Sequence, residues 1–415
     1  MRVAIANSSH RLVGGVETYL HQVAPGLLQH ACEIAFFAEA HGLGNRPEII
    51  SAGDVPTWCI AELGWSVAFS ALRKWRPDVI YVHGIYDIAV EGELLAIAPA
   101  VFYSHGYTGV CISGRKSFRT PTIEPCARRF GPACLAYYYA RRCGGLNPKT
   151  MWQDYREQEA RLNNLRRYRA ILTASEHMRR EYLKHDLASD AVHLLRLPIS
   201  EHTAVAPSSR TAIDRSREIR LLFAGRMVFE KGGEILIDAL PRVASLVERP
   251  VQLDLVGDGP ARSAWEKLAR EVMQHNSNLK IIFHPWLDSA DLAAAFDRTD
   301  LLVVPSVWPE PFGLTGPEAG LHSIPVAAFR VGGIPEWLLE GENGHLADAH
   351  PCRADDLARA IAECFRDDAH YLDLRDGAYR VASQFKSSDH ESQLLAILSA
   401  TIAEPAATRS QIAAR

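Results

Sequence analysis

The sequence contains no apolar run long enough to span a membrane, and its first residues, "MRVAIANSSH", lack the long apolar stretch of a signal peptide. These absences favour a cytoplasmic protein. No Gly-x-x-x-x-Gly-Lys-Ser/Thr pattern occurs, which argues against a P-loop nucleoside triphosphatase. The stretches "GDGPAR" and "GLGNRP" both lack the third glycine of the Gly-x-Gly-x-x-Gly fingerprint, so a nicotinamide-dependent oxidoreductase is disfavoured as well.

Cysteines are few and lack a metal-binding spacing. Four of the eight lie close together in the sequence, at Cys111, Cys126, Cys134 and Cys143, with 14, 7 and 8 residues between them and no Cys-x-x-Cys pair. These spacings fit no common zinc pattern, and a disulfide framework is unexpected in a cytosolic protein. We expect ordinary thiols and no metal; a metal or cluster bound by these four cysteines is the alternative.

Charge is unevenly distributed along the chain. The total is 45 Lys and Arg against 49 Asp and Glu, yet residues 115–184 hold 16 basic and 6 acidic residues. Such a region could face an anionic acceptor or the anionic inner face of the cell membrane, or it could be a solvated helix face with paired charges. Arg166, Arg167 and Arg169, at one predicted helix end, are the candidates for that contact. We expect no nucleic-acid partner.

At 415 residues the chain is long enough for two or three domains. Short apolar runs rich in β-branched residues, such as "RVAIA", "DVIYVH" and "AVFYSH", alternate with helical patterns over 16–29 and 150–168. This alternation is typical of a doubly wound parallel sheet. We predict a first Rossmann-like domain over residues 1–199, on the acceptor side, interrupted by a Cys-rich basic insert at about 106–150.

A polar stretch at 200–218 is predicted to be a linker, and a second alternating series follows it. Its strands include "IRLLFAG", "VQLDLVG" and "DLLVVPS", and its helical patterns cover 233–246, 261–274 and 289–297. We therefore predict a second Rossmann-like domain over 219–385. The last segment, 386–415, holds one more helical pattern at 388–403, which could return to the first domain, and then a tail.

Candidate ligand-binding residues follow the strands, because ligands of open α/β sheets bind beyond the carboxyl ends of the strands. Arg226 and Lys231 come after "LLFAG", and their cations suit a diphosphate. The stretch "SVWPEPFGLTGPEAG" follows another strand and holds two carboxylates, Glu310 and Glu318, eight residues apart. Core packing does not require this pair, so it points to a ligand.

The two carboxylates suit hydroxyl groups at the two ends of one ligand. Glu318 can accept two hydrogen bonds from a vicinal diol such as that of ribose, each worth roughly 1.5–3 kcal/mol. Glu310 would face a second polyol, such as a sugar. Between them, Gly313, Leu314 and Thr315 lead into a helix whose free backbone N–H groups favour an anion. The stretch therefore predicts a nucleotide-sugar, with its diphosphate between the two polyols.

Two glycines of the first domain could reach the same kind of ligand. Gly14 and Gly15 open a helix after the first strand, and they let the backbone approach closely. Taken singly, each candidate residue also fits a surface loop or a turn. Their joint placement after strands, in both predicted domains, is what favours a ligand site.

Three stretches carry a family resemblance: "FAGRMVFEKGGEILIDAL", "LVGDGP" and "PSVWPEPFGLTGPEAGLHSIPVAAFRVGGIPEWLLEGENGHL". They resemble the donor half of the retaining GT-B glycosyltransferases of family four, and the resemblance extends over residues 1–385. It implies an α/β GT-B fold, in which two Rossmann-like doubly wound domains face a central cleft. Two stretches depart from the family pattern: "LPIS" stands where Pro-Asn-Gly is usual, and "HP" at 284–285 stands where a glycine is usual.

The resemblance implies a catalytic set and a donor-binding set. Arg226 and Lys231 would hold the donor diphosphate, Glu310 would lie against the donor sugar, and His105, in "FYSHGYTG", matches the family's histidine near the reacting carbon. Glu318 would hold the ribose. The donor-binding set is Gly14, Gly15, Gly257, Phe312, Gly313, Leu314, Thr315 and Glu318.

We therefore expect a glycosyltransferase that moves a sugar from a UDP- or GDP-linked donor to an unidentified acceptor hydroxyl, with retention at the anomeric carbon. No Asp-x-Asp triplet occurs to hold a divalent ion, so we expect no metal or other cofactor. The product would belong to polysaccharide, glycolipid or other glycoconjugate biosynthesis. The alternatives are another GT-B nucleotide-sugar enzyme, such as an epimerase or a phosphorylase, and a non-catalytic nucleotide-sugar-binding protein.

Overall fold

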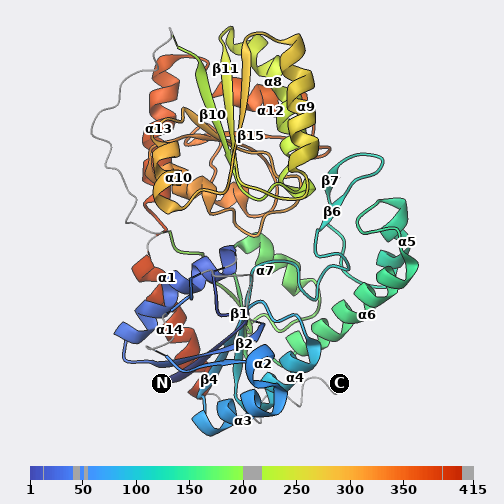
Figure 1. Cartoon of the computed structure of the whole chain (residues 1–415), viewed down its shortest axis with the longest axis vertical. Coiled ribbons are helices and arrows are strands. Elements are labelled where there is room, and N and C mark those ends of the chain that lie inside the picture. The colour runs from blue at the N-terminus through green and yellow to red at the C-terminus, as the bar shows by residue number, and fades with distance from the viewer. Residues whose placement is uncertain (13, 41–46, 51–54, 200–216, 386, 404–415) are drawn as a thin grey trace. The chain divides into compact units, whose positions relative to one another are not determined.

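The computed structural model describes residues 1–12, 14–40, 47–50, 55–199, 217–385 and 387–403 (Figure 1). The chain divides into two compact units, and each is discontinuous in sequence. The first unit comprises Met1–Gly114, Pro148–Pro198 and Ser387–Arg415, and the second comprises Arg115–Asn147 and Ile199–Lys386. The predicted linker, 200–218, lies outside the described residues except for its last two.

The first unit is built on a seven-stranded sheet with the order β3-β2-β1-β4-β5-β8-β9, and all its strand pairs are parallel. The sheet winds outward from β1 in both directions, so its topological switch point lies between β1 and β4. Its strands are β1 (Arg2–Ser9), β2 (Glu33–Ala40), β3 (Thr57–Cys59), β4 (Val79–Val82), β5 (Ala100–Ser104), β8 (Ala170–Thr173) and β9 (Val192–Leu194).

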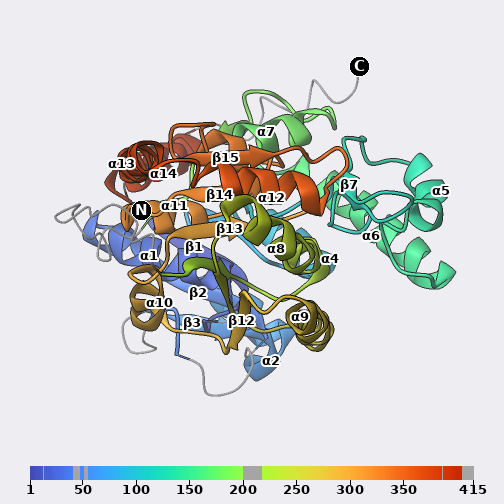
Figure 2. The same cartoon turned by 90° about the horizontal axis from the view of Figure 1, so that it is seen from above.

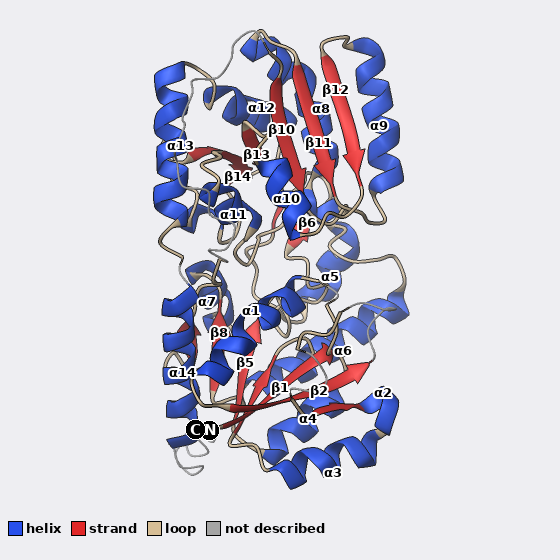
Figure 3. Cartoon of the chain, turned by 60° about the vertical axis from the view of Figure 1, so that its left-hand side comes forward, coloured by secondary structure: helices blue, strands red, loops and turns tan. Residues whose placement is uncertain are grey.

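Helices flank this sheet, as the near-continuous apolar strands require, because such strands are buried on both faces (Figure 3). The last described helix, α14, packs against α1 and against strands β4 and β5, so this helix belongs to the same unit as the first strands of the chain. The helices of the first unit are α1 (Gly15–Gln29), α2 (Ile60–Leu63), α3 (Trp65–Trp75), α4 (Ile88–Ile97), α6 (Pro148–Leu165), α7 (Glu176–Leu183) and α14 (Ser387–Ala403).

The second unit repeats the plan with a six-stranded parallel sheet, in the order β12-β11-β10-β13-β14-β15. Its switch point lies between β10 and β13. The strands are β10 (Ile219–Ala224), β11 (Val251–Val256), β12 (Leu279–His284), β13 (Leu301–Val304), β14 (Val326–Phe329) and β15 (Gly344–Ala347). The prediction of two Rossmann-like doubly wound domains is confirmed.

Helices cover both faces of this sheet too, and Figure 2 shows α8 and α9 on the opposite side of β12 from α10. On the α9 side, the ring of Trp265 packs edge-on against Phe223 of β10, with the ring centroids 5.6 Å apart. The helices are α8 (Gly233–Val247), α9 (Arg262–His275), α10 (Ser289–Phe296), α11 (Thr315–Leu321), α12 (Ala354–Glu363) and α13 (Asp368–Ala382), with two 3-10 turns, η2 (Phe229–Lys231) and η3 (Ile334–Glu336).

The Cys-rich insert differs from the prediction, because most of it belongs to the second unit and not the first. Residues 115–147 hold a two-stranded antiparallel pair, β6 (Ser117–Phe118) and β7 (Glu124–Pro125), followed by helix α5 (Ala133–Ala140). The N–H of Cys352 donates to the carbonyl of Ile123 over 2.9 Å, and Arg119 pairs with Glu230. Contacts distant in sequence therefore hold the insert on the second unit.

None of the described helices has both the length and the apolarity needed to cross a membrane.

Candidate functional site

Two loops of the second unit carry the predicted charged residues, and both lie at the switch point of the sheet. Residues 225–232 follow β10 and include Arg226 and Lys231, whereas residues 305–314 follow β13 and include Glu310. Because β10 and β13 are neighbours and parallel, their carboxyl ends lie side by side. This is the edge where ligands of doubly wound sheets bind.

The structure joins two of the predicted catalytic residues directly. Lys231 Nζ lies 2.6 Å from Glu310 Oε1, and the Ser306 hydroxyl donates to the same oxygen over 2.5 Å. The Glu310 side chain is only 4% exposed, while that of Lys231 is 30% exposed. Both protein donors thus converge on Oε1, which leaves Oε2 for a ligand. Ser306 was not predicted, although it is the second residue after β13 and stands four residues before Glu310.

Two glycines allow the loops to come this close. At Gly232 (φ +68°) a Cβ would lie 1.9 Å from the carbonyl oxygen of Pro305, and at Gly332 (φ +58°) it would lie 2.2 Å from that of Glu310. Both residues also adopt the left-handed conformation that favours glycine. A side chain at either position would push the Lys231 and Glu310 loops apart.

Arg226 and Glu318 differ from this pair because they have no ionic partner within the described residues. Arg226 is exposed and is the second residue after β10. Glu318, in the first turn of α11, is partly exposed, and its carboxylate has no hydrogen-bond donor in the described part of the chain. Burial raises the pKa of Glu318 to about 7. A carboxylate in that state gains from ligand hydroxyls that donate to it.

The turn between the two glutamates is held by Trp337. Its indole N–H donates to the Phe312 carbonyl over 2.6 Å, and its ring lies where a Cβ on Gly316 would be, 2.0 Å away. Phe312 itself is buried and packs against Phe385, and Leu314 packs on a small apolar cluster. The side chains of Phe312 and Leu314 therefore support the turn.

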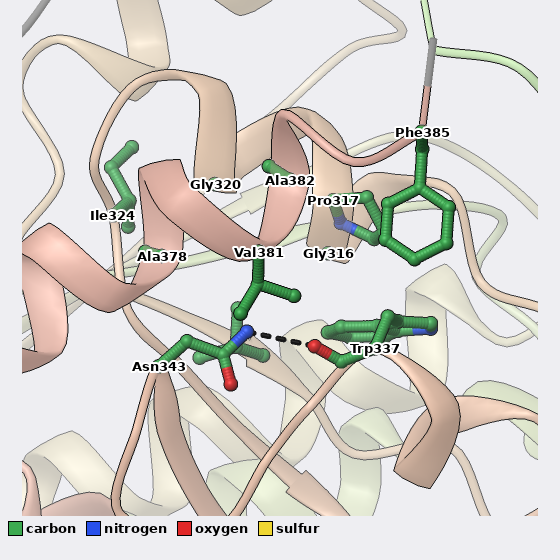
Figure 4. A pocket seen from close by; sticks show the side chains of 11 residues that line it. Gly316, Pro317, Gly320, Ile324, Trp337, Asn343, Ala378, Val381, Ala382 and Phe385 are labelled. Atoms are coloured by element: carbon green, nitrogen blue, oxygen red, sulfur yellow. Dashed lines mark hydrogen bonds between the residues drawn. The ribbon is translucent and has the colours of Figure 1, made fainter.

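Gly313 and Thr315 are partly exposed, and the backbone N–H groups of residues 313–315 have no acceptor in the described residues. The α11 helix is only seven residues long, so these N–H groups, more than a helix dipole, would meet an anion. Behind α11 lies a void of about 10 Å³, near Asn343, whose amide donates to the Trp337 carbonyl over 2.8 Å (Figure 4).

Gly257 and a larger cavity lie apart from these contacts. Gly257 follows β11 and sits against the Gly225 carbonyl, 2.1 Å from where its Cβ would be, so it permits two neighbouring turns to approach. A cavity of about 520 Å³ lies under α10 against the polar face of β10, β11 and β12. Its lining includes Arg220, Asp254 and His284 but none of the predicted site residues.

Arginines of the insert contact the loop that carries Lys231. Arg115 Nε lies 3.1 Å from a Glu230 carboxylate oxygen, and Arg119 lies 3.5 Å from the same oxygen. The Arg119 guanidinium also stacks on Phe229, 3.7 Å from the ring centroid, and burial lowers its pKa. The Glu230 carbonyl accepts the Val307 N–H over 2.9 Å, so this turn is fixed from both sides. These contacts could not be predicted from local sequence patterns, because more than a hundred residues separate the partners.

In the first unit, the predicted glycines begin α1. The Gly14 N–H donates to Glu17 over 2.8 Å, and the other oxygen of Glu17 accepts from Asn7 over 2.8 Å. The N–H of Gly14 is therefore already bonded within the protein. A Cβ on Gly15 would meet nothing within 4 Å, so Gly15 is the more accessible of the two. The Glu17 capping role follows from its place three residues after the N-cap.

His105 follows β5, as predicted, and its imidazole pairs with a second histidine. Its Nε2 lies 2.9 Å from Nδ1 of His83, which follows β4 and was not predicted. Burial lowers the pKa of His105 to about 3, and burial and the neighbouring His105 lower that of His83. His105 is partly exposed, so it can offer a neutral hydrogen-bonding group to a ligand.

The four clustered cysteines do not converge. None of the four forms a disulfide, and among the described residues none belongs to a group of three side chains close enough to share a metal ion. The alternative of a metal held by Cys111, Cys126, Cys134 and Cys143 has no support in this geometry. Another group does converge in the second unit, and it is described below.

Two family models match the chain, and together they cover most of it. Residues 13–202 match "Glycosyltransferase Family 4", and residues 218–367 match "Glycosyl transferases group 1". The first match covers most of the described first unit, and the second includes Arg226, Lys231, Glu310 and Glu318.

Curated relatives and solved structures agree with these matches. A D-inositol 3-phosphate glycosyltransferase of Corynebacterium glutamicum is 28% identical over 94% of this chain and 92% of its own length. An uncharacterized protein from the cps region of Klebsiella pneumoniae is 27% identical over 42% of this chain. The matched part is 44% of that relative's length, so this chain spans less than half of it.

HepE from Anabaena, solved in complex with UDP, is 20% identical and superposes with a TM-score of 0.67, over 96% of this chain and 100% of that one. At this identity the likeness shows the fold alone, and that fold is GT-B. From the two family matches and this fold together, the chain belongs to the family four (group 1) glycosyltransferases.

Proposed function

We propose that the protein transfers a sugar from a nucleotide-diphosphate donor, UDP- or GDP-linked, to an acceptor hydroxyl with retention at the anomeric carbon and without a divalent ion. The observation that carries this proposal is the Lys231–Glu310 pair at the switch point of the second unit, together with Arg226, which has no ionic partner among the described residues. Cations and a carboxylate with a free oxygen at one sheet edge suit a diphosphate joined to a polyol.

Charge on the leaving diphosphate is what the site would stabilise. As the bond from the anomeric carbon to the diphosphate oxygen breaks, its electron pair stays on the diphosphate. Lys231 and the exposed Arg226 supply positive charge there, in place of a metal ion. The partly exposed Lys231 can reach a phosphate while Glu310 still contacts it, so one side chain would link the phosphate and sugar subsites.

The acceptor would attack on the face that the diphosphate leaves. The acceptor oxygen bonds to the anomeric carbon, and its proton passes to an oxygen of the leaving phosphate. Glu310 is a poor nucleophile in this arrangement, because Lys231 and Ser306 both donate to Oε1. We assign it to hydroxyls of the donor sugar, through Oε2, and Glu318 to the ribose diol.

Neutral hydrogen bonding would come from the first unit. His105 stays uncharged at neutral pH, because burial lowers its pKa to about 3. Such a group can bond a sugar hydroxyl without adding charge near the reacting carbon. Gly15 would offer its backbone to a phosphate oxygen, whereas the Gly14 N–H is held by Glu17.

The acceptor could be anionic or lie at an anionic membrane surface, and the exposed residues Arg166 and Arg167 after α6 favour this. Both bond neutral acceptors of the protein, Arg166 to Asn163 and Arg167 to Asn164. Arg115 and Arg119 of the same basic region are instead paired with the Glu230 carboxylate. Co-sedimentation with acidic liposomes at low and at 0.5 M salt tests the membrane version. An absence of binding at low salt would leave a soluble anionic acceptor.

A donor screen tests the function itself. The purified protein would be incubated with UDP-, GDP- and ADP-sugars and candidate acceptors, with products identified by mass spectrometry and the anomeric configuration by NMR. We expect one nucleotide class to turn over with retention and in excess EDTA. Inversion, or conversion of the donor without an acceptor, would refute the retaining transferase in favour of another nucleotide-sugar enzyme. Tight nucleotide binding with no turnover would indicate a binding protein.

A further inference from the structure

Two histidines and a glutamate converge where β15, α12 and α13 meet in the second unit. His345 lies on β15, Glu363 is the last residue of α12, and His370 lies in the first turn of α13. Each offers a ligand atom, and the three atoms lie within 4.8 Å of one another. None of the three takes part in the proposed transfer.

The two imidazoles face each other through the same ring atom. Nε2 of His345 and Nε2 of His370 are 2.9 Å apart, and both residues are buried, with 7% and 8% of their surface exposed. Two neutral imidazoles can hold this geometry only if the Nε2–H of one donates a hydrogen bond to the Nε2 lone pair of the other. A divalent cation between them would replace that proton and bind both lone pairs.

A carboxylate bonds His345 on the ring nitrogen that faces away from His370, and metal-binding histidines are commonly oriented in this way. His345 Nδ1 lies 2.6 Å from Glu340 Oε1, so this nitrogen donates and Nε2 keeps its lone pair toward His370. Glu340 is itself held, because its second oxygen accepts the Leu346 N–H over 2.9 Å and a bond from Arg330 over 3.3 Å. Metal-binding histidines characteristically donate their other ring N–H to such a carboxylate or carbonyl.

We propose that His345, Glu363 and His370 bind a zinc ion, with water as the fourth ligand. Nitrogen and carboxylate ligands in this ratio suit zinc. Zinc–nitrogen bonds of about 2.0–2.1 Å in a tetrahedral site place two nitrogens about 3.3 Å apart, so the histidines would need to separate by only a few tenths of an ångström. Glu363 is partly exposed at the end of its helix and bonds Arg366, so its carboxylate can turn to the ion.

The zinc would pin the edge strand of the sheet to two helices. β15 ends the strand order, and α13 packs on α11, the helix that carries Glu318. The ion would therefore stabilise the second unit without entering the transfer reaction. Stability and turnover should respond differently to its removal.

The test uses the purified full chain. Its zinc content would be measured by plasma mass spectrometry after dialysis against zinc and then buffer, and its melting temperature with and without zinc. We expect one zinc per chain and a rise of several degrees in melting temperature at a zinc concentration 100-fold above Kd. Cobalt in place of zinc should give the visible absorption of a tetrahedral site.

Matched variants locate the ion. His345→Ala and His370→Ala should abolish binding. Glu340→Gln, which removes only the carboxylate behind His345, should weaken zinc affinity by about 10- to 100-fold and should fold even if the histidine variants do not. The control is His10→Ala, because His10, Cys59 and Glu62 form the other convergent group among the described residues, in the first unit.

Two results would overturn the proposal. One is a wild-type chain with no stoichiometric zinc and no zinc-dependent melting shift. The other is zinc that is lost in His10→Ala but kept in Glu340→Gln and His345→Ala.

Discussion

The polar clusters of the two units differ in charge. In the first unit, His83 and His105 bond each other, and nearby Tyr19 and Tyr81 share a 2.6 Å bond between their hydroxyls; all four are held neutral by burial, which lowers the histidine pKa values and raises the tyrosine ones. In the second unit, Lys231 and Glu310 form an ion pair at the switch point.

The difference comes from what surrounds each cluster. In the first unit the ring stacking of Tyr103 on His105, with centroids 4.8 Å apart, leaves little room for water, so the uncharged forms are favoured. In the second unit, a buried carboxylate is compensated by a partly exposed cation. Charge stabilisation for an anionic ligand is therefore available in the second unit, whereas the described histidine and tyrosine cluster of the first unit offers neutral hydrogen bonds.

The largest effect should come from removing a cation of the second unit. Lys231→Ala or Arg226→Ala should lower kcat by about 10²–10³, the typical loss for one transition-state charge stabiliser. Steady-state kinetics with the donor found in the screen would measure it, and circular dichroism would verify folding. Near-normal turnover in both single variants would show that charge stabilisation lies elsewhere.

A smaller effect should follow from Glu318→Gln, and it should depend on pH. The loss of a charged acceptor for the ribose diol should weaken donor binding by about 10- to 100-fold, since a neutral amide accepts each of the two bonds about 1 kcal/mol less favourably than a carboxylate. Because the pKa of Glu318 is about 7, wild-type affinity should rise between pH 6 and 8 as the carboxylate ionises. Calorimetric titration with the nucleotide would show this rise, and the variant should bind equally at both pH values.

The same group gives a stability test with the opposite sign. Because burial raises the pKa of Glu318 above its unfolded value, the native state keeps a proton that the unfolded chain loses, so stability declines as pH rises from about 4.3 to 7. Glu318→Gln should flatten this decline in urea titrations. If the variant keeps the wild-type pH profile of both binding and stability, Glu318 is not the group that titrates near pH 7.

The next largest effect should come from removing an arginine of the insert. Arg119→Ala removes the stack on Phe229 and one partner of Glu230, together worth roughly 0.7–1.4 kcal/mol, so we expect a three- to tenfold loss in kcat/KM through a less ordered Lys231 turn. Arg119→Lys should restore only part of it, because lysine lacks the planar stacking group. Arg129→Ala, elsewhere on the insert, is the control. Equal losses in both variants would mean that the insert acts only through general stability.

No effect on the shape of the pH–rate profile is expected from changing His105 in the first unit. Because the pKa of His105 is about 3, its charge should not change between pH 5 and 9, and it should contribute no inflection to the pH–rate profile. His105→Asn, which keeps a neutral hydrogen-bonding group, should leave the shape of the profile unchanged. Loss of an inflection between pH 5 and 8 in that variant would show that His105 becomes charged, and would remove the contrast between the units.

Local patterns were sufficient for much of the fold. The helical patterns over 16–29, 233–246 and 261–274 match α1, α8 and α9 to within one residue at either end, because apolar spacing along a helix is a local property. The charged residues after β10 and β13 were also found, since a parallel sheet brings the ends of neighbouring strands together. That argument is topological and needs no side-chain coordinates.

Contacts between distant segments could not be predicted in this way. The insert was assigned to the unit that surrounds it in sequence, but its arginines bond Glu230, and the His345–His370 pair joins residues from a strand and a helix with no shared motif. The pairing of His83 with His105 was missed for the same reason, because each histidine alone fits an ordinary loop.

The discontinuity of the two units has a consequence for modular exchange among relatives. A fragment of residues 199–386 would contain the second sheet but would lack Arg115 and Arg119, and a fragment of residues 1–198 would carry an insert without its docking partner and miss α14. A chimera that swaps the two halves at the linker would therefore mismatch the insert with a foreign Lys231 turn. Hybrids should retain function best when residues 115–147 come from the same parent as the second half of the chain, and α14 from the same parent as the first half.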